Sequence, residues 1–366
     1  MQLLKLRCKP GAQFRLGSRS LDRTDSIIHS DTLFSGLANV WANIFGDVET
    51  LCDWFDGDAP KVRMSSGFYA VERRSASEVL NTIYFLPRPP IEVDSDPDEG
   101  VKAWKKVRFI SLGVYNRLGK LASDQSGLYR SGEKLLEHVN IGGKCLCTAA
   151  EIGGTANRAA ADNKLAMFTA EPNAPKVHVH KRDDKDAFYT ETNLQFRDVP
   201  LNGSEFLRGH FYVLIDHSLA ETDWNKLLAC FRILADEGVG GERSTGKGRF
   251  ESVEVERLPD ELQNLPDSSD LFLSLSMLSP RDQAEFNQLE AYDLTLRGAW
   301  TLGNDDEDDG DTKANRTREF HRKQVRLVQE GALLSEEVRG RIVDVSPDNN
   351  PSHPIYRNGT AFTIPI

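Results

Sequence analysis

The 366-residue chain is long enough for two ordinary domains, and its 39% hydrophobic and 28% charged residues contain neither an apolar run of membrane-spanning length nor a secretory signal. These absences argue against the membrane and secreted classes. Five cysteines, an odd number without a disulfide framework, agree with a reducing environment, so we expect a cytoplasmic protein. The net charge of -11 argues against a polyanionic partner. However, ten of the 56 acidic residues lie in two short runs, the first at residues 94–99 and the second at 305–311, and the remaining 46 nearly balance 45 basic residues. Nucleic acid therefore remains a possible partner.

The start of the chain predicts a strand, a basic turn and a helix. The strand covers residues 3–8, and an arginine-rich turn follows it. From Leu33 onward apolar residues recur at helical spacing until Gly46, which ends the helix. Ser30 or Asp31 is the predicted N-cap, and the free amides of the first helical turn form an anion site.

His29, directly before this helix, allows two interpretations. As a general acid or base it could cleave RNA, which makes the chain a candidate metal-independent ribonuclease. As a cap residue or a phosphate contact it would do no chemistry. Spacing alone supplies no second histidine or lysine to act with it, so both interpretations stay open.

The next segment predicts two strands and a basic stretch. Residues 64–69 and 82–86 have strand-like patterns, and prolines end the second strand. After the first acidic run, Lys105, Lys106 and Arg108 lead into a further strand and a short helix. Because these cations stand together in an acidic protein, they are candidates for binding phosphate rather than only solvated charges.

Residues 120–200 have weak periodicity and many small residues. A loop at 153–158, which contains Arg158, and an extended basic arm at 176–182 stand out within them. Such a long excursion either binds something or is a disordered insertion, and the sequence leaves both readings open.

Two pairs of residues in this segment could be pooled as ligands of one zinc ion. They are Cys145 and Cys147, and His178 and His180. Neither spacing matches the pairs that usually hold structural zinc, so free thiols and surface histidines are the better account, and we expect no cofactor.

A buried strand at 210–216 is predicted to open the second half of the chain. A helix then begins at Thr222 or Asp223 and ends at Gly238, and a strand follows near Phe250. Further strands are predicted at 271–277, 292–300, 325–328, 341–345 and 362–364. The second acidic run would form a hairpin tip between the strands that end near Leu302 and begin near His321. This pattern indicates an α+β arrangement in each half, with helices on one face of an antiparallel sheet.

The segment between helix and strand, residues 238–248, is rich in glycine and is called the glycine loop below. Its residues 241–247 fit the first seven positions of a nucleotide-binding P-loop, but Gly248 stands where the magnesium ligand is required. A P-loop also follows a strand and precedes a helix, whereas this loop has the opposite order, which argues against an ATPase. The loop amides with Arg243, Lys247 and Arg249 could instead hold a phosphate backbone, or the loop is only a helix C-cap and a flexible turn.

Several short motifs, in this order, resemble one family. They are His29-Ser30-Asp31-Thr32-Leu33-Phe34-Ser35, Ser65-Ser66-Gly67-Phe68, Leu86-Pro87-Arg88-Pro89, the glycine loop, residues 292–300, Glu330-Gly331, and residues 340–345 with 353–362. Together they resemble the fourth subunit of the Csm complex, the type III-A CRISPR effector, a member of the RAMP superfamily of CRISPR RNA-binding proteins. The resemblance extends from the first strand to the last residue.

The resemblance implies two tandem ferredoxin-like, RRM-type domains with long loop insertions, which we expect at residues 1–204 and 205–366. It implies a non-catalytic subunit that holds the repeat-derived 5′ tag of CRISPR RNA in antiviral interference. The implied partners are this RNA, the large polymerase-like subunit, the repeated backbone RAMP subunit and, indirectly, target RNA. No membrane contact and no homo-oligomer are expected.

The resemblance also implies which residues contact the RNA. They are His29 and Ser30 at the helix entrance, Lys105 and Lys106 in the basic stretch, Arg158 in an arginine-containing loop, and Gly240, Gly241, Arg243, Ser244, Gly246 and Lys247 in the glycine loop. The usual aromatic RRM signature is absent, so recognition should depend on the RNA backbone and shape. The acidic insertion at 304–311 matches no function of the family.

Overall fold

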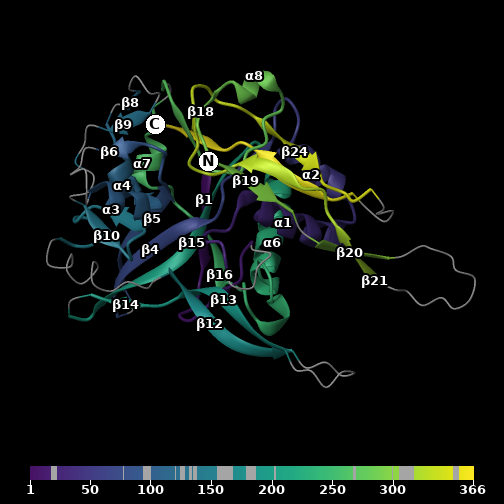
Figure 1. Cartoon of the computed structure of the whole chain (residues 1–366), viewed down its shortest axis with the longest axis horizontal. Helices are drawn as coiled ribbons and strands as arrows, with labels where there is room; N and C mark the ends of the chain where they lie inside the picture. Colours follow the sequence, from purple (N-terminus) through teal and green to yellow (C-terminus); the bar gives the residue numbers. More distant parts are fainter. Residues whose placement is uncertain are drawn as a thin grey trace, which may run out of the picture.

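The computed structural model (Figure 1) describes the chain except for residues 18–22, 77, 94–99, 120, 124–127, 132–133, 135–137, 155–167, 179–186, 202, 267–268, 299, 305–316 and 349–353. For residues 100, 168–178, 187–190, 300–304 and 317–321 it describes the backbone alone. Arg158, His180 and all of both acidic runs therefore lie outside the described residues. No helix in the described ranges is long and apolar enough to cross a membrane.

A large mixed sheet forms the centre of the protein. Its main path runs in the order β10-β11-β7-β5-β4-β15-β1-β16, with β3 and β14 paired to β15. The strands are β1 (Gln2–Arg7), β3 (Val62–Met64), β4 (Phe68–Ser75), β5 (Glu78–Pro87), β7 (Phe109–Ser111), β10 (Val139–Ile141), β11 (Cys145–Cys147), β14 (Val199–Pro200), β15 (Glu205–His217) and β16 (Ser252–Glu256). All described pairs in this sheet are antiparallel except β11 with β7. The predicted α+β class is confirmed.

Two long helices, α1 (Ser30–Phe45) and α6 (Glu221–Glu237), lie side by side against this sheet (Figure 1). Both end at the predicted glycines, and Gly46 has the left-handed conformation that ends many helices. His29 is the N-cap of α1, so the prediction of Ser30 or Asp31 is wrong by one or two positions. A further helix, α2 (Val48–Phe55), was not predicted; Asp47 caps it by accepting a hydrogen bond from the Thr50 amide.

The strand predicted to open a second domain lies in the middle of the first sheet. β15 pairs with β1 on one side and with β4 on the other, and β16 pairs with the opposite edge of β1. The predicted boundary after residue 204 therefore runs through a single sheet. A strand buried on both faces has the same apolar sequence whether it begins a domain or completes one, which is why the pattern did not reveal this pairing.

The long segment between β5 and β15 contains short elements and one long hairpin. The short elements are β6 (Glu92–Val93), α3 (Gly100–Lys106), α4 (Leu112–Tyr115), β8 (Ala122–Ser123) and β9 (Tyr129–Ser131). The hairpin consists of β12 (Phe168–His178) and β13 (Ala187–Phe196), projects from the body of the protein in Figure 1, and is joined at its base to β2 (Gln13–Phe14). The predicted extended arm begins on β12, and the basic stretch with Lys105 and Lys106 is helical.

The chain after β16 forms small sheets, hairpins and short helices. Their elements are α7 (Asp260–Gln263), β17 (Phe272–Ser274), α8 (Gln283–Phe286), β18 (Leu289–Ala291), β19 (Leu294–Arg297), β20 (Trp300–Asn304), β21 (Thr317–His321), β22 (Val325–Val328), β23 (Leu333–Leu334), β24 (Gly340–Asp344), β25 (Tyr356–Thr360) and β26 (Thr363–Pro365). β20 pairs with β21, as predicted for the strands on either side of the second acidic run, whose tip lies outside the described residues.

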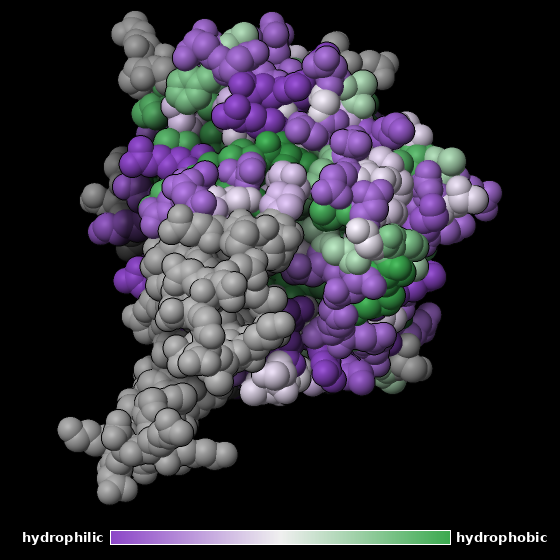
Figure 2. All heavy atoms as spheres, turned by 90° about the vertical axis from the view of Figure 1, so that its right-hand side faces the viewer, coloured by the Kyte–Doolittle hydropathy of each residue, from purple (hydrophilic) through white to green (hydrophobic). Residues whose placement is uncertain are grey.

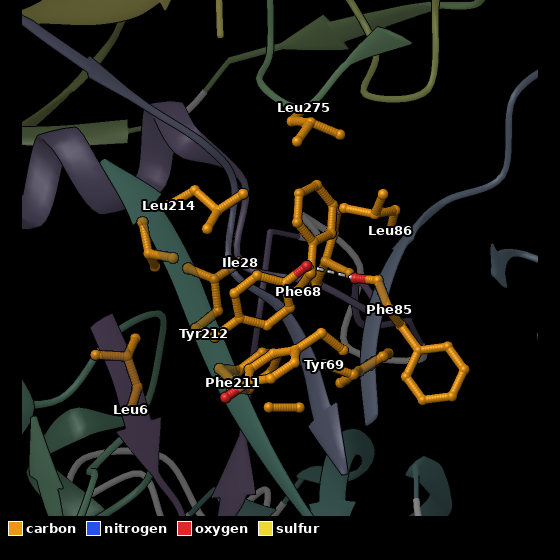
Figure 3. Close-up of a cluster of buried hydrophobic side chains, with 14 of the residues drawn as sticks. Leu6, Ile28, Phe68, Tyr69, Phe85, Leu86, Phe211, Tyr212, Leu214 and Leu275 are labelled. Atoms are coloured by element: carbon orange, nitrogen blue, oxygen red, sulfur yellow. Dashed lines mark hydrogen bonds between the residues drawn. The ribbon is translucent and has the colours of Figure 1, made fainter. Parts of the chain in front are cut away.

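One hydrophobic core joins the central sheet to these C-terminal strands. Figure 3 shows Leu275 above Phe68 and Leu86, and Tyr212 donating a hydrogen bond to the Phe85 carbonyl at 2.9 Å. Leu275 is fully buried in the same cluster, and the Ser66 amide donates to its carbonyl at 2.8 Å. The two parts of the chain are therefore packed together rather than linked as separate bodies.

Candidate nucleic-acid interface

The backbone of the glycine loop is fixed against the strand segment that follows β1. The Gly241 amide donates to the Arg15 carbonyl and the Gly248 amide to the Gln13 carbonyl, both at 2.8 Å. Gly240 has φ +92°, and a Cβ there would lie 2.2 Å from the Arg15 carbonyl oxygen, so only glycine fits. The order helix α6, loop, strand β16 also agrees with the argument against a P-loop.

Part of the glycine loop faces solvent. Residues 241–246 are exposed, and η3 (Arg243–Thr245) presents Arg243 and Ser244 at the surface. The nearest carboxylate to Arg243 among the described ion pairs is Glu237, at 3.9 Å, with both side chains about half exposed. Such a distant, solvated pair holds the guanidinium only weakly, so Arg243 is available to an anion.

Lys247 points the other way, into the protein. Its ammonium group lies 2.5 Å from the Glu191 carboxylate and 3.1 Å from the Asn193 side-chain oxygen, and it is 9% exposed. Lys247 therefore compensates a buried carboxylate on β13 and ties the loop to the β12–β13 hairpin.

His29 and Ser30 are also engaged inside the protein. Ser30 is fully buried; its amide donates to Ser66 Oγ at 2.8 Å, and its hydroxyl accepts from the Met277 amide at 3.0 Å. His29 Nδ1 lies 2.9 Å from Glu330 Oε1, and Nε2 lies 3.4 Å from Asp25 Oδ2. Both ring nitrogens therefore face carboxylates.

The surroundings of His29 favour its charged form. Burial alone would lower the pKa of His29, but the charge of Glu330 and the hydrogen bonds with Asp25 and Glu330 outweigh burial and raise the pKa to about 10. A doubly protonated ring has no free nitrogen to act as a general base near pH 7.

The first turn of α1 carries a buried carboxylate, Asp31. Burial would raise the pKa of Asp31, but Arg297 and Arg357 outweigh burial and hold it below the usual range. Arg297 Nε donates to Asp31 Oδ2 at 2.9 Å and Nη2 to Oδ1 at 3.0 Å, and Arg357 Nη1 donates to Oδ2 as well. Asp31 therefore holds two arginines of the C-terminal strands at the entrance of the helix where an anion site was predicted.

A cavity of about 290 Å³, called the arginine groove below, lies between the glycine loop, α1 and the C-terminal strands. Hydroxyl and amide groups of Thr32, Ser35 and Asn39 line it beside the backbone of residues 238–241. Its cations are Arg243, Arg297, Arg322 and Arg357. Among the described residues that line the groove there is no carboxylate, so this hollow is suited to an anion.

Arg322 is the least compensated cation of the arginine groove. Its Nε is buried and donates no hydrogen bond within the described part of the chain. Burial and the nearby charge of Arg357 lower the pKa of Arg322. A phosphate oxygen would satisfy this donor and reduce the repulsion between the two guanidinium groups.

The sequence located one of the four groove arginines, Arg243. Arg297 and Arg357 lie within motifs that were noted, but neither was selected, and Arg322 was not noted. Each is an isolated arginine on or beside a short strand, and no local pattern marks it. Only the folded arrangement, in which β25 packs against α1 and Arg297 reaches Asp31, brings the three together.

Lys105 and Lys106 are exposed at the end of α3, and neither lines the arginine groove. Cys145 and Cys147 are buried on β11, and burial raises the pKa of Cys145. Among the described residues, no three His, Cys, Asp or Glu side chains are grouped as they would be around a metal ion.

The face of the protein shown in Figure 2 is mostly hydrophilic, with hydrophobic residues in small separate groups. Such a surface is suited to a polar partner rather than to a broad apolar contact.

Comparisons with known proteins cover the whole chain. Residues 267–366 match the family described as the CRISPR Csm4 C-terminal domain. The CRISPR system Cms protein Csm4 of Methanocaldococcus jannaschii is 23% identical over 401 aligned positions, covering 100% of this chain and 98% of that protein.

Two solved structures share the fold over the full length of this chain. One is the Csm3-Csm4 subcomplex of the type III-A CRISPR-Cas interference complex, with a TM-score of 0.60, 20% identity and coverage of 100% of this chain and 99% of the matched chain. The other is a Csm1-Csm4 cassette in complex with pppApA, with a TM-score of 0.52, 17% identity and coverage of 100% and 98%.

Proposed function

We propose that this chain is a Csm4-type subunit of a type III CRISPR complex, a non-catalytic RNA-binding subunit that holds the 5′ tag of CRISPR RNA; the match of residues 267–366 and the full-length similarity to a Csm4 protein support this. The arginine groove is the observation that carries the proposal. Single-stranded RNA is held by arginine, lysine and backbone amides on its phosphates, and the groove offers arginines without a carboxylate among its described lining residues.

The proposed RNA contacts are the exposed groups of the glycine loop and the groove. Gly240, Gly241, Arg243, Ser244 and Gly246 keep the role expected from the sequence. Arg322, which lines the same groove, is added to them. His29, Ser30 and Lys247 support the interface from behind, since all three are held by contacts within the protein.

Lys105 and Lys106 remain proposed contacts for a more distant part of the RNA, supported by their exposure. Arg158 lies outside the described residues, and its RNA contact remains a proposal from the resemblance.

The fold proposal includes one ferredoxin-like unit built from β1, α1, β4, β15, α6 and β16. Its support is the strand order β16-β1-β15-β4, which is that of a β-α-β-β-α-β unit with two antiparallel outer pairs. The glycine loop connects α6 to β16 and so belongs to this first unit. The small C-terminal sheets have no comparable order among the described strands, so the support for a second such unit is weaker.

We propose two protein partners from the solved relatives. Those relatives are crystallised with Csm3 in one case and with Csm1 in the other. By analogy this chain would contact a repeated backbone subunit and the large subunit. A cytoplasmic location is part of the proposal, and the five free cysteines are consistent with a reducing compartment.

The non-catalytic assignment is supported by the state of His29. A ribonuclease that used this residue would need one ring nitrogen free of carboxylates, and both are engaged. Incubating the purified protein with repeat RNA in EDTA tests this directly. Cleavage that disappears in His29→Ala would overturn the assignment.

The experiment for RNA binding uses the full chain co-expressed with CRISPR RNA and the other subunits. The double variant Arg243→Ala, Arg322→Ala should weaken binding and flatten the plot of log affinity against log salt by about 0.7 for each lost phosphate contact. Arg257→Ala is the matched control, because Arg257 is 82% exposed and pairs only with exposed Asp260 among the described ion pairs. An unchanged affinity and salt slope in the double variant would contradict the proposal.

A further inference from the structure

A second cavity, of about 470 Å³, opens beside the N-terminal end of α1. It lies between residues 24–29, the turn after β5, the start of β7 and the C-terminal strands, and it is called the Tyr292 pocket below. Arg297 lines both this pocket and the arginine groove, so the two hollows are neighbours separated by one side chain. Its volume is in the range of pockets that enclose small ligands.

Three cations form one wall of the Tyr292 pocket. Backbone hydrogen bonds place them side by side: the Arg88 amide donates to the Arg108 carbonyl at 2.9 Å, and the Arg108 amide donates to the Lys144 carbonyl at 2.8 Å. Arg88 Nε donates to the Val107 carbonyl at 2.9 Å, and its guanidinium lies 5.0 Å from the centre of the Trp104 ring. The backbone of this wall and the Arg88 side chain are therefore positioned before any ligand arrives, and Arg108 and Lys144 are exposed beside them.

The charge of this wall is not compensated within the described part of the protein. His29 faces Glu330, and Arg297 faces Asp25 and Asp31, so these groups neutralise one another. Neither Arg108 nor Lys144 has an ion pair among the described residues, and Asp293 is the remaining carboxylate in the described lining. Burial and the charge of Arg108 lower the pKa of Arg88. The pocket therefore has an excess of positive charge.

The opposite side of the pocket presents an aromatic ring and polar groups. Tyr292 is 37% exposed, and its ring contacts Phe286 edge to face at 6.1 Å between centroids. Asp293, Thr295 and Gln329 also line the pocket, and the Gln329 amide donates to the Asp293 carbonyl at 2.9 Å. An accessible ring beside fixed donors and acceptors is suited to a nucleobase, which stacks on one face and forms hydrogen bonds at its edge.

We propose that the Tyr292 pocket takes one unstacked nucleotide of the bound RNA. Its phosphate lies on Arg108 and Lys144, and its base stacks on Tyr292. The inference depends on the proposed RNA-binding function, since the strand reaches the pocket from the arginine groove past Arg297. It assigns a second binding position to Arg108, already a phosphate candidate from the sequence, and to Tyr292 and Lys144, which were not among the expected RNA contacts.

The first part of the test is position-specific cross-linking. CRISPR RNA carrying 4-thiouridine at successive single positions is assembled with the full chain and its partner subunits and then irradiated. We expect one position to cross-link to the peptide that contains Tyr292. Cross-links to this peptide from no position, or equally from all positions, would overturn the proposal.

The second part uses variants of exposed pocket residues. Tyr292→Ala should weaken RNA binding about 5- to 150-fold, the range for losing one stacked base, whereas Tyr292→Phe should bind as the wild type does. Arg108→Gln with Lys144→Gln should flatten the salt dependence by about 0.7, because both cations lie on a single phosphate. Wild-type affinity in Tyr292→Ala would overturn the stacking assignment.

The groove variant separates the two proposals. If Arg243→Ala with Arg322→Ala weakens binding while the pocket variants do not, the pocket inference fails and the proposed function stands. If neither set weakens binding, the proposed function fails.

A free nucleotide offers the same chemistry as a nucleotide of the RNA, so the last part of the test is calorimetry with AMP on the RNA-loaded complex. AMP binding that is lost in Tyr292→Ala would show that the pocket is empty of RNA and overturn the assignment.

Discussion

At the scale of single residues, His29 connects two distant parts of the chain. It precedes α1, and its imidazolium faces Glu330, which lies some three hundred residues later and is 3% exposed at its side chain. Ser66 Oγ also donates to Glu330. The His29–Glu330 ion pair is largely buried, so removing either charge leaves the other without compensation.

The raised pKa of His29 predicts how stability should depend on pH. The pKa is about 10 in the folded state and 6.5 without perturbation, so the contribution of His29 is fully present below pH 6.5 and is lost as pH rises toward 10. We compare the free energy of unfolding of the wild type and His29→Gln by urea denaturation. The advantage of the wild type should fall by at most about 1.4 kcal/mol per pH unit across this window. A constant difference in the free energy of unfolding from pH 6 to pH 10 would contradict an ion pair between His29 and Glu330.

The residues of the candidate interface were only partly accessible to sequence reasoning. Arg243 could be found because it stands in a glycine-rich segment of unusual composition. Lys247 stands in the same segment, and sequence gave no sign that it turns inward to Glu191, since the contact depends on a hairpin more than fifty residues away. Arg322 could not be found from sequence, because only the fold shows that its buried Nε has no hydrogen-bond partner in the described part of the protein.

At the scale of elements, the glycine loop is a fixed structure on one side and an exposed one on the other. Gly240 and Gly248 approach neighbouring backbone so closely that an added Cβ would lie 2.2 Å from a carbonyl oxygen in each case. Gly246 has a similar positive φ, +88°, but open space around it. Gly240 and Gly246 are therefore a matched pair: a side chain at either position strains the backbone, but only at Gly240 must it also displace the loop.

Gly240→Ala and Gly246→Ala should have different effects on RNA binding. Both place alanine in a left-handed conformation, at a cost of about 1 to 2 kcal/mol in stability. Gly240→Ala must also push the loop away from Arg15, so it should lose RNA affinity and unfold at lower denaturant concentration than Gly246→Ala. Denaturation midpoints and RNA titrations on both variants measure this, and equal behaviour of the two would mean that the fixed side of the loop does not shape the interface.

The elements themselves were predictable to the extent that their signals are local. α6 combines apolar residues at helical spacing with a terminal glycine, and it begins within two residues of the predicted position. α2 has a comparable local signal, since Asp47 caps it and Leu51, Trp54 and Phe55 form its buried face, and it could have been found. Residues 100–106 contain three lysines, which favour helices over strands, so their helical form could also have been predicted.

At the scale of the whole molecule, the shared core predicts cooperative unfolding. Leu273, Leu275 and Phe362 from the C-terminal strands pack in the same hydrophobic cluster as the central sheet. Asp31 is also paired with arginines from β19 and β25. Each part therefore buries surface that the other would expose if it unfolded alone.

Differential scanning calorimetry of the full chain should show one transition. The calorimetric and van't Hoff enthalpies should agree, as they do for a single cooperative unit. Two resolved transitions would indicate two independently stable domains and would contradict the shared core. Residues 267–366 expressed alone should remain unfolded, which circular dichroism can measure.

The arrangement of the sheet was the least predictable feature. Strand patterns show which residues are buried but not which strands are neighbours, and the pairing of β15 with β1 joins residues about two hundred positions apart. The domain boundary was predicted after residue 204 because a long irregular segment precedes it. That segment is an insertion between strands of one sheet rather than a linker.

The central position of β1 has a consequence for synthesis. β1 is complete after residue 7, but its two neighbours are β15 and β16, at residues 205–217 and 252–256. At about 5 to 20 residues per second, both edges of this apolar strand stay without their native partners for on the order of ten to fifty seconds while the ribosome makes the rest. During this interval the nascent chain exposes two hydrogen-bonding edges to other chains, so aggregation during synthesis is favoured until β15 and β16 have been made.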